Sequence, residues 1–487
     1  MSTTATQPSP PGPPLVRFGR MQSKGVLLGF SGVRLAAIGC AMATLVIGMF
    51  AGGWVGILDG SPLWVGLTAL AFIPCNGRAL IEQLPLLAHW SRRSAVRQTR
   101  YLVRASAPRP DGTMALPGDA AALRFHCDPL TGAVMVHDPH RRTLTAVVRL
   151  THPAYVLLSP EDQMQRVGGW SRALAAFAAS GTCAGVQVME STLPDPGHGV
   201  RGWFAMHGVP GGSWASREYA TLLELAAPAS STHRTLIAVS LDMQRAAKAI
   251  RDAGRGITGA AQVLRGDMTG VESSLRAASL TVGGWLTAPE MAVVIRQAYD
   301  PAADSMRPTD PGADLATAGP VAVHEQWDHL RHDCAYSAVL WVSEWPRIDV
   351  PAHFLHSLIF TQGVRKTVSI IARPLPTNEA LRKLRKEKVE YVTEAQQKAR
   401  IGRIADLADD QEYADVLARE QALICGHADL RFTGFIAVTA PSRDELSSAV
   451  ACIERAAQQS GCETRTLFGQ QSQAFTVAAL PLARTVS

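Results

Sequence analysis

The sequence predicts an α/β protein with a membrane anchor, and two observations support this prediction. A strongly apolar stretch, in which Asp59 is the one charged residue, lies near the amino end, over residues 35–77. Further along, the order strand, Ser-capped helix, glycine, strand occurs twice, over residues 142–190 and 430–468. That order is typical of a split βαβ layer, a sheet with helices on a single face. We therefore expect a transmembrane helical hairpin followed by two ferredoxin-like cytoplasmic domains.

The first apolar segment, Leu35 to Leu58, is about 24 residues long, and a helix of that length crosses a hydrocarbon core of about 30 Å. A turn-forming cluster at 59–62 separates it from a shorter uncharged segment, Leu63 to Gly77. The alternative interpretation is a buried core hairpin in a soluble protein. The residues expected to anchor the chain in lipid are Leu35, Trp54, Leu58, Leu63, Trp64 and Ile73.

Basic residues flank the hairpin on both sides, whereas its connecting turn carries only Asp59. By the positive-inside rule, both termini are expected in the cytoplasm, with the anchor in the plasma membrane. Much of the net charge of +6 is therefore explained by topology and is weak evidence for nucleic-acid binding. The flanking residues are Arg17, Arg20, Lys24 and Arg34 before the hairpin and Arg78, Arg92, Arg93, Arg97, Arg100, Arg104 and Arg109 after it.

Composition indicates a folded protein with reduced thiols. The chain has 487 residues, of which 47% are hydrophobic, enough for two α/β domains besides the anchor. Its eight cysteines form no C-x-x-C pair and no short-range framework, which favours free cytoplasmic thiols. The predicted parts are a disordered basic tail (1–34), the hairpin (35–77), a basic amphipathic exit helix and linker (78–118), a first α/β domain (119–300), a linker (301–320) and a second α/β domain (321–487).

Local patterns place the elements within each domain. In the first domain we predict strands at 134–137, 142–151, 185–189 and 236–241, and helices from Ser159 to Gly181 and at 216–225, 246–278 and 289–298. In the second we predict strands at 336–342, 365–372, 430–440, 463–468 and 474–480, and helices at 350–361, 376–425 (with Gly402 as a candidate break) and from Ser442 to Gly461.

Catalytic motifs are scarce. The phosphate-binding pattern G-x-x-x-x-G-K-[ST] is absent, which excludes an ordinary P-loop ATPase. Residues 197–202 match G-x-G-x-x-G in spacing, but Pro194-Asp195-Pro196 precedes them instead of a strand, so we interpret them as a loop. No G-x-S-x-G elbow is present either. We therefore predict no cofactor and no enzymatic activity.

Two clusters leave other hypotheses open. The first comprises Asp328, His329, His332 and Cys334, which could supply metal ligands to a membrane-tethered enzyme, although histidines that are solvated or satisfied within the fold are the commoner case. The second is a basic patch that nucleic acid or anionic lipid could bind, although interleaved acids such as Glu379 and Glu387 favour a solvated helix face. The patch residues are Arg382, Lys383, Arg385, Lys386 and Lys388.

Several short segments resemble those of a known family: Leu144–Leu150 (LTAVVRL), Gly168-Gly169-Trp170, Glu344–Arg347 (EWPR), Arg365–Ser369 (RKTVS), Gly469–Phe475 (GQQSQAF) and Leu480-Pro481-Leu482. Together with the layout, they resemble an actinobacterial membrane-protein family of conjugation-like, type IV secretion-related loci. That family is encoded beside a PrgI-like small membrane protein and a VirB-type ATPase. Residues 321–487 are similar to the region that precedes the motor in VirB-type ATPases. The layout is also similar to EccE of type VII secretion.

These resemblances imply a non-enzymatic, membrane-anchored docking subunit that recruits a partner ATPase at the inner face of the plasma membrane. The implied partners are membrane lipid, a VirB-type ATPase and a PrgI-like protein, with nucleic acid or a second copy of the chain as further candidates. An EccE-like subunit of a type VII membrane complex is the first alternative, and the metal-dependent enzyme is the second.

Overall fold

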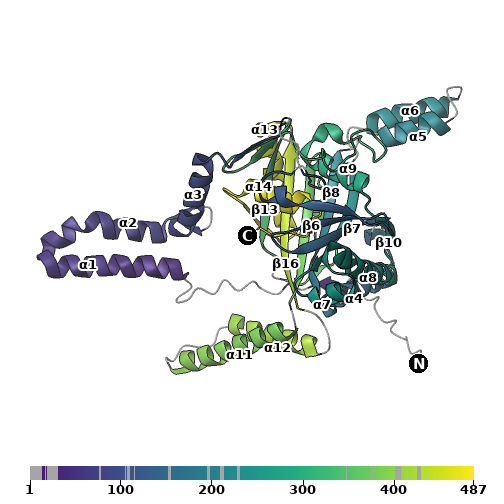
Figure 1. Cartoon of the computed structure of the whole chain (residues 1–487). Helices are drawn as coiled ribbons and strands as arrows, with labels where there is room; N and C mark the ends of the chain where they lie inside the picture. The colour runs from purple at the N-terminus through teal and green to yellow at the C-terminus, as the bar shows by residue number, and fades with distance from the viewer. Residues whose placement is uncertain are drawn as a thin grey trace, which may run out of the picture.

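A computed structural model gives the chain a mixed α/β architecture with antiparallel sheets and an apolar helix near the N-terminus (Figure 1). The residues that it describes are 14–16, 18, 31–75, 78–104, 106, 110–114, 116–151, 155–194, 198–208, 213–226, 231–346, 348–375, 377–400, 407–424 and 429–486.

Most strands join one 13-stranded sheet, whose neighbouring pairs are all antiparallel. Its order is β4 (Arg100–Leu102), β11 (Ala322–Glu325), β12 (Leu330–His332), β13 (Ala335–Glu344), β16 (Leu430–Ala440), β15 (Arg365–Pro374), β8 (Cys183–Pro194), β9 (Ser231–Asp242), β7 (Thr143–Thr151), β6 (Val134–Asp138) and β5 (Arg124–Cys127). Two further strands pair along its sides, β10 (Thr281–Trp285) with β7 and β17 (Glu463–Thr466) with β13.

The helices follow the two halves of this sheet. The longer ones are α3 (Leu80–Ala95), α4 (Pro160–Ala179), α5 (His198–His207), α6 (Trp214–Ala226), α8 (Gly256–Ala277), α9 (Ala288–Tyr299), α11 (Thr377–Arg400), α12 (Leu407–Ile424), α13 (Arg443–Gln459) and α14 (Gln471–Ala479). Short pieces are α7 (Ala247–Asp252), α10 (His356–Ile359), η1 (Gly118–Ala122), η2 (Tyr155–Leu157) and η4 (Pro301–Ala303). Two small sheets pair β1 (Leu15–Val16) with β14 (Val350–Pro351) and β2 (Pro74–Cys75) with β3 (Arg78–Ala79).

Both halves use the same order of elements. The first runs β7, α4, β8, a pair of helices (α5 and α6), β9, α8, β10 and α9; the second runs β13, α10, β15, a pair of helices (α11 and α12), β16, α13, β17 and α14. Their strands also lie in the same spatial order, β10-β7-β9-β8 and β17-β13-β16-β15. Each half is preceded by a β-meander, since β5 and β6 lead to β7 as β11 and β12 lead to β13.

The halves meet where β8 pairs with β15. Met189 lies opposite Ser369 in the middle of this pairing, which runs from Val186↔Ala372 to Thr192↔Lys366. The exchange of backbone hydrogen bonds turns what would be two sheet edges into the interior of one sheet.

Gln187, buried beside this seam, attaches the C-terminal segment. Its amide nitrogen donates to Ser369 Oγ and to the carbonyls of Val477 and Leu480, and its amide oxygen accepts the Ala483 N–H at 2.7 Å. All polar atoms of this buried side chain are thus satisfied, as a protein interior requires.

Helices cover both faces of the sheet. On one face, α9 and α14 pack into a single core that spans both halves, with Met291, Phe475, Met189 and Ile371 among its members. On the other face, α8 and α4 cover the first half and α13 covers the second, in separate clusters. The central strands are therefore buried on both sides, and their side chains alternate between the two cores.

The apolar hairpin reverses direction at a different place from the one that the sequence predicts. Within α1 (Gly32–Asp59), Gly53 has φ 57° and ψ −133°, outside the helical range. A Cβ on Gly56 would lie 2.2 Å from the carbonyl oxygen of Gly48, although eight residues along one continuous helix would separate them by about 12 Å. The chain therefore folds back at Gly53, and residues 59–62 form only a junction before α2 (Ser61–Phe72).

Several local predictions also need correction. Residues 474–479 of the predicted strand 474–480 belong to helix α14, because Ala474, Phe475 and Val477 are buried and tertiary packing overrides their strand propensity. The predicted helix at 350–361 is only strand β14 and short α10. Helix α5 starts at His198, within the predicted glycine loop. The helical region 376–425 is two helices, while Gly402 lies outside the described residues.

We expect Gln187→Ala to lower the free energy of unfolding by about 2 to 4 kcal/mol, because several buried polar groups would lose their partner. Denaturant unfolding of the detergent-solubilised chain measures this effect. The matched control is Gln244→Ala, at an exposed position in the same half. A loss no larger than that of the control would contradict the role assigned to Gln187.

Candidate functional site

The candidate site is the junction between the apolar hairpin and the sheet, which helix α3 forms. Arg93 on α3 makes an ion pair with Glu325 on β11, and its other nitrogen donates to the Gly469 carbonyl at 3.3 Å. Glu325 is only 2% exposed, and its second oxygen accepts the Ser472 N–H at the start of α14. The buried Glu325 carboxylate thus joins α3 to α14, the core helix of the second half. It lies at the N-terminus of α14, where the helix dipole favours a negative charge.

Aromatic rings reinforce this junction. Trp90 of α3 meets Trp327 edge-to-face at 5.3 Å between centroids, and Trp327 stacks on Phe468 at 5.9 Å. Gly469 adopts φ 66°, and a Cβ there would lie 2.7 Å from the Trp327 ring. Only glycine suits both the left-handed backbone and the close ring, which explains the glycine at the start of the segment 469–475.

The segment before the hairpin is attached to the same half. Strand β1 pairs with β14, and Phe18 stacks on Trp345 at 5.1 Å and meets Phe354 edge-on at 5.2 Å. After the hairpin, β4 continues from α3 and pairs with β11. The strands before and after the apolar hairpin, β1 and β4, therefore both attach to the second half.

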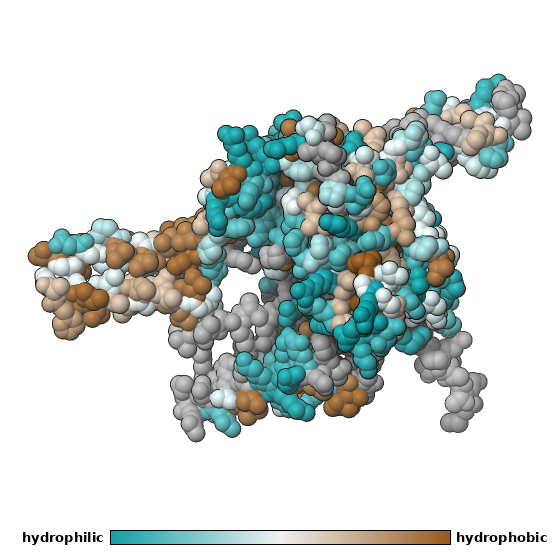
Figure 2. All heavy atoms as spheres, in the orientation of Figure 1, coloured by the Kyte–Doolittle hydropathy of each residue, from teal (hydrophilic) through white to brown (hydrophobic). Residues whose placement is uncertain are grey.

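The predicted anchor residues lie on a projecting apolar arm, which Figure 2 shows in brown tones. Trp54 is 83% exposed, and Leu58, Leu63 and Ile73 are also exposed. Leu35 and Trp64 are half-buried, and the Trp64 indole donates to the Ile57 carbonyl. An apolar surface of this size is unusual on a soluble monomer. Among the described residues, one helix, α1, is long and apolar enough to cross a membrane, and α2 is a shorter apolar helix.

The histidine cluster is not gathered into a metal site. His332 is fully buried, with Nδ1 against the Tyr299 carbonyl and Nε2 against Ser337 Oγ, so both ring nitrogens are used. Burial lowers the pKa of His332 to about 4, which keeps the ring neutral. His329 pairs with Asp328, whereas Cys334 contacts Asp300. In the described part of the chain, no three His, Cys, Asp or Glu side chains are grouped to hold a metal ion.

The basic patch lies on α11, which packs against α12 as a helical hairpin around Leu384 and Val416. Lys383 pairs with Glu379 along the same helix, and Lys388 pairs with Glu420 of α12 at 2.8 Å. Hydrogen bonding to Glu420 raises the pKa of Lys388. Arg382, Arg385 and Lys386 are exposed. Part of the patch thus serves the hairpin itself, and binding of nucleic acid or lipid stays a prediction.

A second exposed surface was not singled out from the sequence. Helices α5 and α6 project from the end of the sheet away from α1 and α2 (Figure 1). This α5–α6 hairpin carries the exposed side chains Val200, Trp203, Met206, Trp214, Tyr219, Leu222 and Leu225. Trp203 stacks on His207 within α5 at 4.8 Å between ring centroids, and 57% of the Trp203 surface is still exposed. Two tryptophans on either side of a glycine-rich segment were the available sequence signal.

Comparison with known families gives one match. The model of EccE, described as a putative type VII ESX secretion system translocon, matches residues 229–342. This segment runs from β9 through β10 and α9 to β13, and it includes Glu325 and Trp327 of the junction. No curated protein matches the chain.

The match supports a membrane subunit of a secretion system. Of the two resemblances noted in the sequence, it favours EccE over the conjugation-related family. The match covers residues 229–342 of 487, which are the later part of the first half (β9 to α9) and the beginning of the second half (β11 to β13). It includes neither the apolar hairpin nor the helical pairs α5–α6 and α11–α12. The VirB-type ATPase and the PrgI-like protein find no support in it.

We expect Arg93→Met to lower the apparent melting temperature by several degrees, because it leaves the Glu325 carboxylate buried without its cation. The double variant Arg93→Met, Glu325→Gln should recover part of this loss, since the buried charge is then removed as well. Thermal denaturation in detergent measures both. The neighbouring, exposed Arg92→Met is the control. Equal effects of the two single variants would show that the ion pair does not fix α3.

Proposed function

We propose that the chain is a non-catalytic, membrane-anchored subunit of a type VII-like secretion complex, with its sheet on the cytoplasmic side. The observation that carries the proposal is the junction of Trp90, Arg93 and Glu325, which ties an exposed apolar hairpin firmly to the segment matched by EccE. A subunit of a membrane complex must hold its sheet in a fixed orientation relative to the bilayer, and the junction at α3 would provide this. A protein that is only tethered to the membrane could have a flexible linker instead. Confinement at the membrane also raises the effective concentration for weak contacts.

We further propose that the hairpin spans the membrane twice. The reversal at Gly53 supports this proposal, because it divides the hairpin into arms at 32–52 and 54–72. Each arm has about 20 residues and a length of about 30 Å, comparable to a hydrocarbon core. Since β1 and α3 both attach to the second half of the sheet, both ends of the hairpin would lie on one side of the membrane.

The strand orders support two ferredoxin-like units, at 119–300 and 321–487, joined by 301–320. In each order the third strand lies between the first two and antiparallel to both, and the fourth lies beside the first. This is the arrangement of a split βαβ layer. Each unit would carry one helical hairpin inserted between its second and third strands.

For the α5–α6 hairpin we propose docking of a cytoplasmic protein, the ATPase of the same secretion complex. The hairpin extends away from α1 and α2, so the bilayer that holds α1 would not cover it (Figure 1). Its exposed surface is mainly apolar and aromatic, the composition found at the centre of protein interfaces.

The topology can be tested with paired reporters. A phosphatase that is active only outside the cell, inserted after Gly53, should be active, and the same enzyme fused after Ser487 should be inactive. A fluorescent protein that matures only in the cytoplasm should give the reverse pattern. Membrane fractionation is the companion measurement: a chain that stays in the supernatant of lysed cells without detergent would exclude the anchor.

Docking can be tested by purifying the tagged full chain from its own membranes in mild detergent. We expect a P-loop ATPase to co-purify, and the double variant Trp203→Ser, Trp214→Ser to reduce its yield by about tenfold, since two exposed aromatic anchors are lost. The control is Val389→Ser, exposed on the α11–α12 hairpin. Unchanged recovery in the double variant would assign the contact to another surface.

A further inference from the structure

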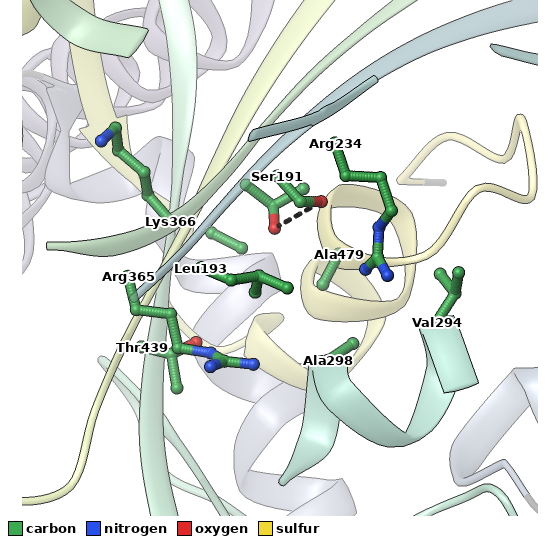
Figure 3. A pocket seen from close by; sticks show the side chains of 11 residues that line it. Ser191, Leu193, Arg234, Val294, Ala298, Arg365, Lys366, Thr439 and Ala479 are labelled. Carbon is green, nitrogen blue, oxygen red and sulfur yellow. Dashed lines mark hydrogen bonds between the residues drawn. The ribbon is translucent and has the colours of Figure 1, made fainter. Parts of the chain in front are cut away.

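A pocket of ≈ 330 Å³, part of it open to solvent, lies at one end of the β8–β15 seam (Figure 3). Strands β8, β9 and β15 form one wall, and α9 and the end of α14 form the other, with Leu193, Val294 and Ala298 as its apolar lining. The space is narrow, and only about one water-sized particle fits between its walls. Two arginines, one from each half, enter it: Arg234 on β9 and Arg365 on β15.

The two guanidinium groups converge on one residue of α9. Arg234 Nη1 donates to the side-chain oxygen of Gln297 at 2.8 Å, and Arg365 donates to the Gln297 backbone carbonyl. Arg365 is nearly buried and forms an ion pair with Asp304, whose carbonyl accepts the Gln297 amide N–H at 3.1 Å. Two cations therefore line this pocket, and one carboxylate, that of Asp304, pairs with Arg365 beside it.

Within the described part of the chain, Arg234 is the cation without a direct ion pair, although the charges of Asp304 and Glu190 act on it and oppose the lowering of its pKa. Among the described residues it forms no ion pair, and its Nε is buried without a hydrogen-bond partner. Burial and the nearby charge of Arg365 lower the pKa of Arg234 to about 10. Glu190, the nearest acid on β8, is turned to the other face of the sheet, where it accepts the Thr235 hydroxyl and lies beside His233.

Lys366 follows Arg365 directly and lines the pocket, but its ammonium group does not join the two guanidinium groups. Figure 3 shows its side chain pointing away from the two guanidinium groups, and its Nζ donates to the Thr361 carbonyl at 2.7 Å. The excess of one positive charge therefore belongs to the pair Arg234 and Arg365, and a water molecule could fill the space but could not neutralise the charge.

We propose that Arg234 and Arg365 bind one small monovalent anion, either a halide or one end of a small carboxylate, at the seam between the two halves. A fixed pair of guanidinium forks suits such an anion, and the narrow space selects against larger ones. Because one arginine comes from each half, the bound anion strengthens their contact beside the β8–β15 pairing.

The first experiment is thermal denaturation of the detergent-solubilised full chain at constant ionic strength, with chloride or formate replacing the bulky anion gluconate. The expected result is a saturable rise of the melting temperature, by about 3 °C or more at high occupancy. Arg234→Gln should abolish the rise. Arg149→Gln should retain it, because Arg149 on the neighbouring β7 is more exposed and already paired with Glu290.

The second measurement does not depend on a variant that folds. Binding to the unaltered protein should broaden the ³⁵Cl NMR signal of chloride, and formate should reverse the broadening by competition. The proposal would be overturned if formate did not reverse the broadening of the chloride signal. It would also be overturned if chloride changed the melting temperature equally in the wild type and in Arg234→Gln, and water would then be the occupant. A formate-reversible signal that Arg234→Gln removes would establish the site.

Discussion

The pairing of β8 with β15 is the constraint on which the rest of the molecule depends. It places Met189 and Ser369 opposite each other at the middle of one sheet, so the strands of both halves become interior strands. The core under α9 and α14 then has no boundary between the halves, since Met291 from one and Phe475 from the other belong to the same cluster. Separating the halves would expose this core and two long strand edges at once, and both are costly in water.

Because the two halves share one sheet and one core, the contacts at the hairpin junction restrain both halves relative to the apolar hairpin. In the part of the chain that the structure describes, the segments on both sides of the apolar hairpin attach to the second half, through β1 and Phe18 on one side and through α3 and β4 on the other. Glu325 also accepts the backbone N–H of Ser472 at the start of α14, and α14 packs on the shared core. A rotation of the hairpin relative to the sheet would have to break a buried ion pair and an aromatic contact. The first half is therefore held in place relative to the apolar hairpin through the seam.

The two helical hairpins illustrate how repeated architecture can serve different surfaces. Both are inserted between the second and third strands of their halves, where additions do not interrupt the sheet. The α5–α6 hairpin exposes tryptophans and aliphatic side chains, whereas the α11–α12 hairpin is rich in charged residues that partly pair with each other. Because the insertion points are equivalent and the surfaces are not, a single subunit can present two distinct faces to a larger assembly.

Sequence patterns predicted many of the local elements and the apolar helix near the N-terminus. Some features depend only on neighbours a few residues away, so the sequence predicted them. Examples are the strand at 430–440, the helix caps at Ser159 and Ser442, and the apolar helix that includes Leu35. The repetition of strand, helix and strand also indicated a similar architecture in both halves. The reversal at Gly53 was missed, because a close approach of Gly48 and Gly56 is a contact between two arms and not a property of either glycine.

Only the tertiary structure decided how the halves combine and what the polar residues do. Nothing in the local sequence distinguishes Gln187 from an exposed glutamine or Arg93 from its neighbour Arg92, since their roles depend on Val477 and Glu325, which are hundreds of positions away. The same holds for His332, whose two ring nitrogens are occupied by the Tyr299 carbonyl and Ser337 and not by a metal. The physical reason is that side-chain period and capping are set by adjacent residues, whereas burial and charge pairing are set by the packing of distant ones.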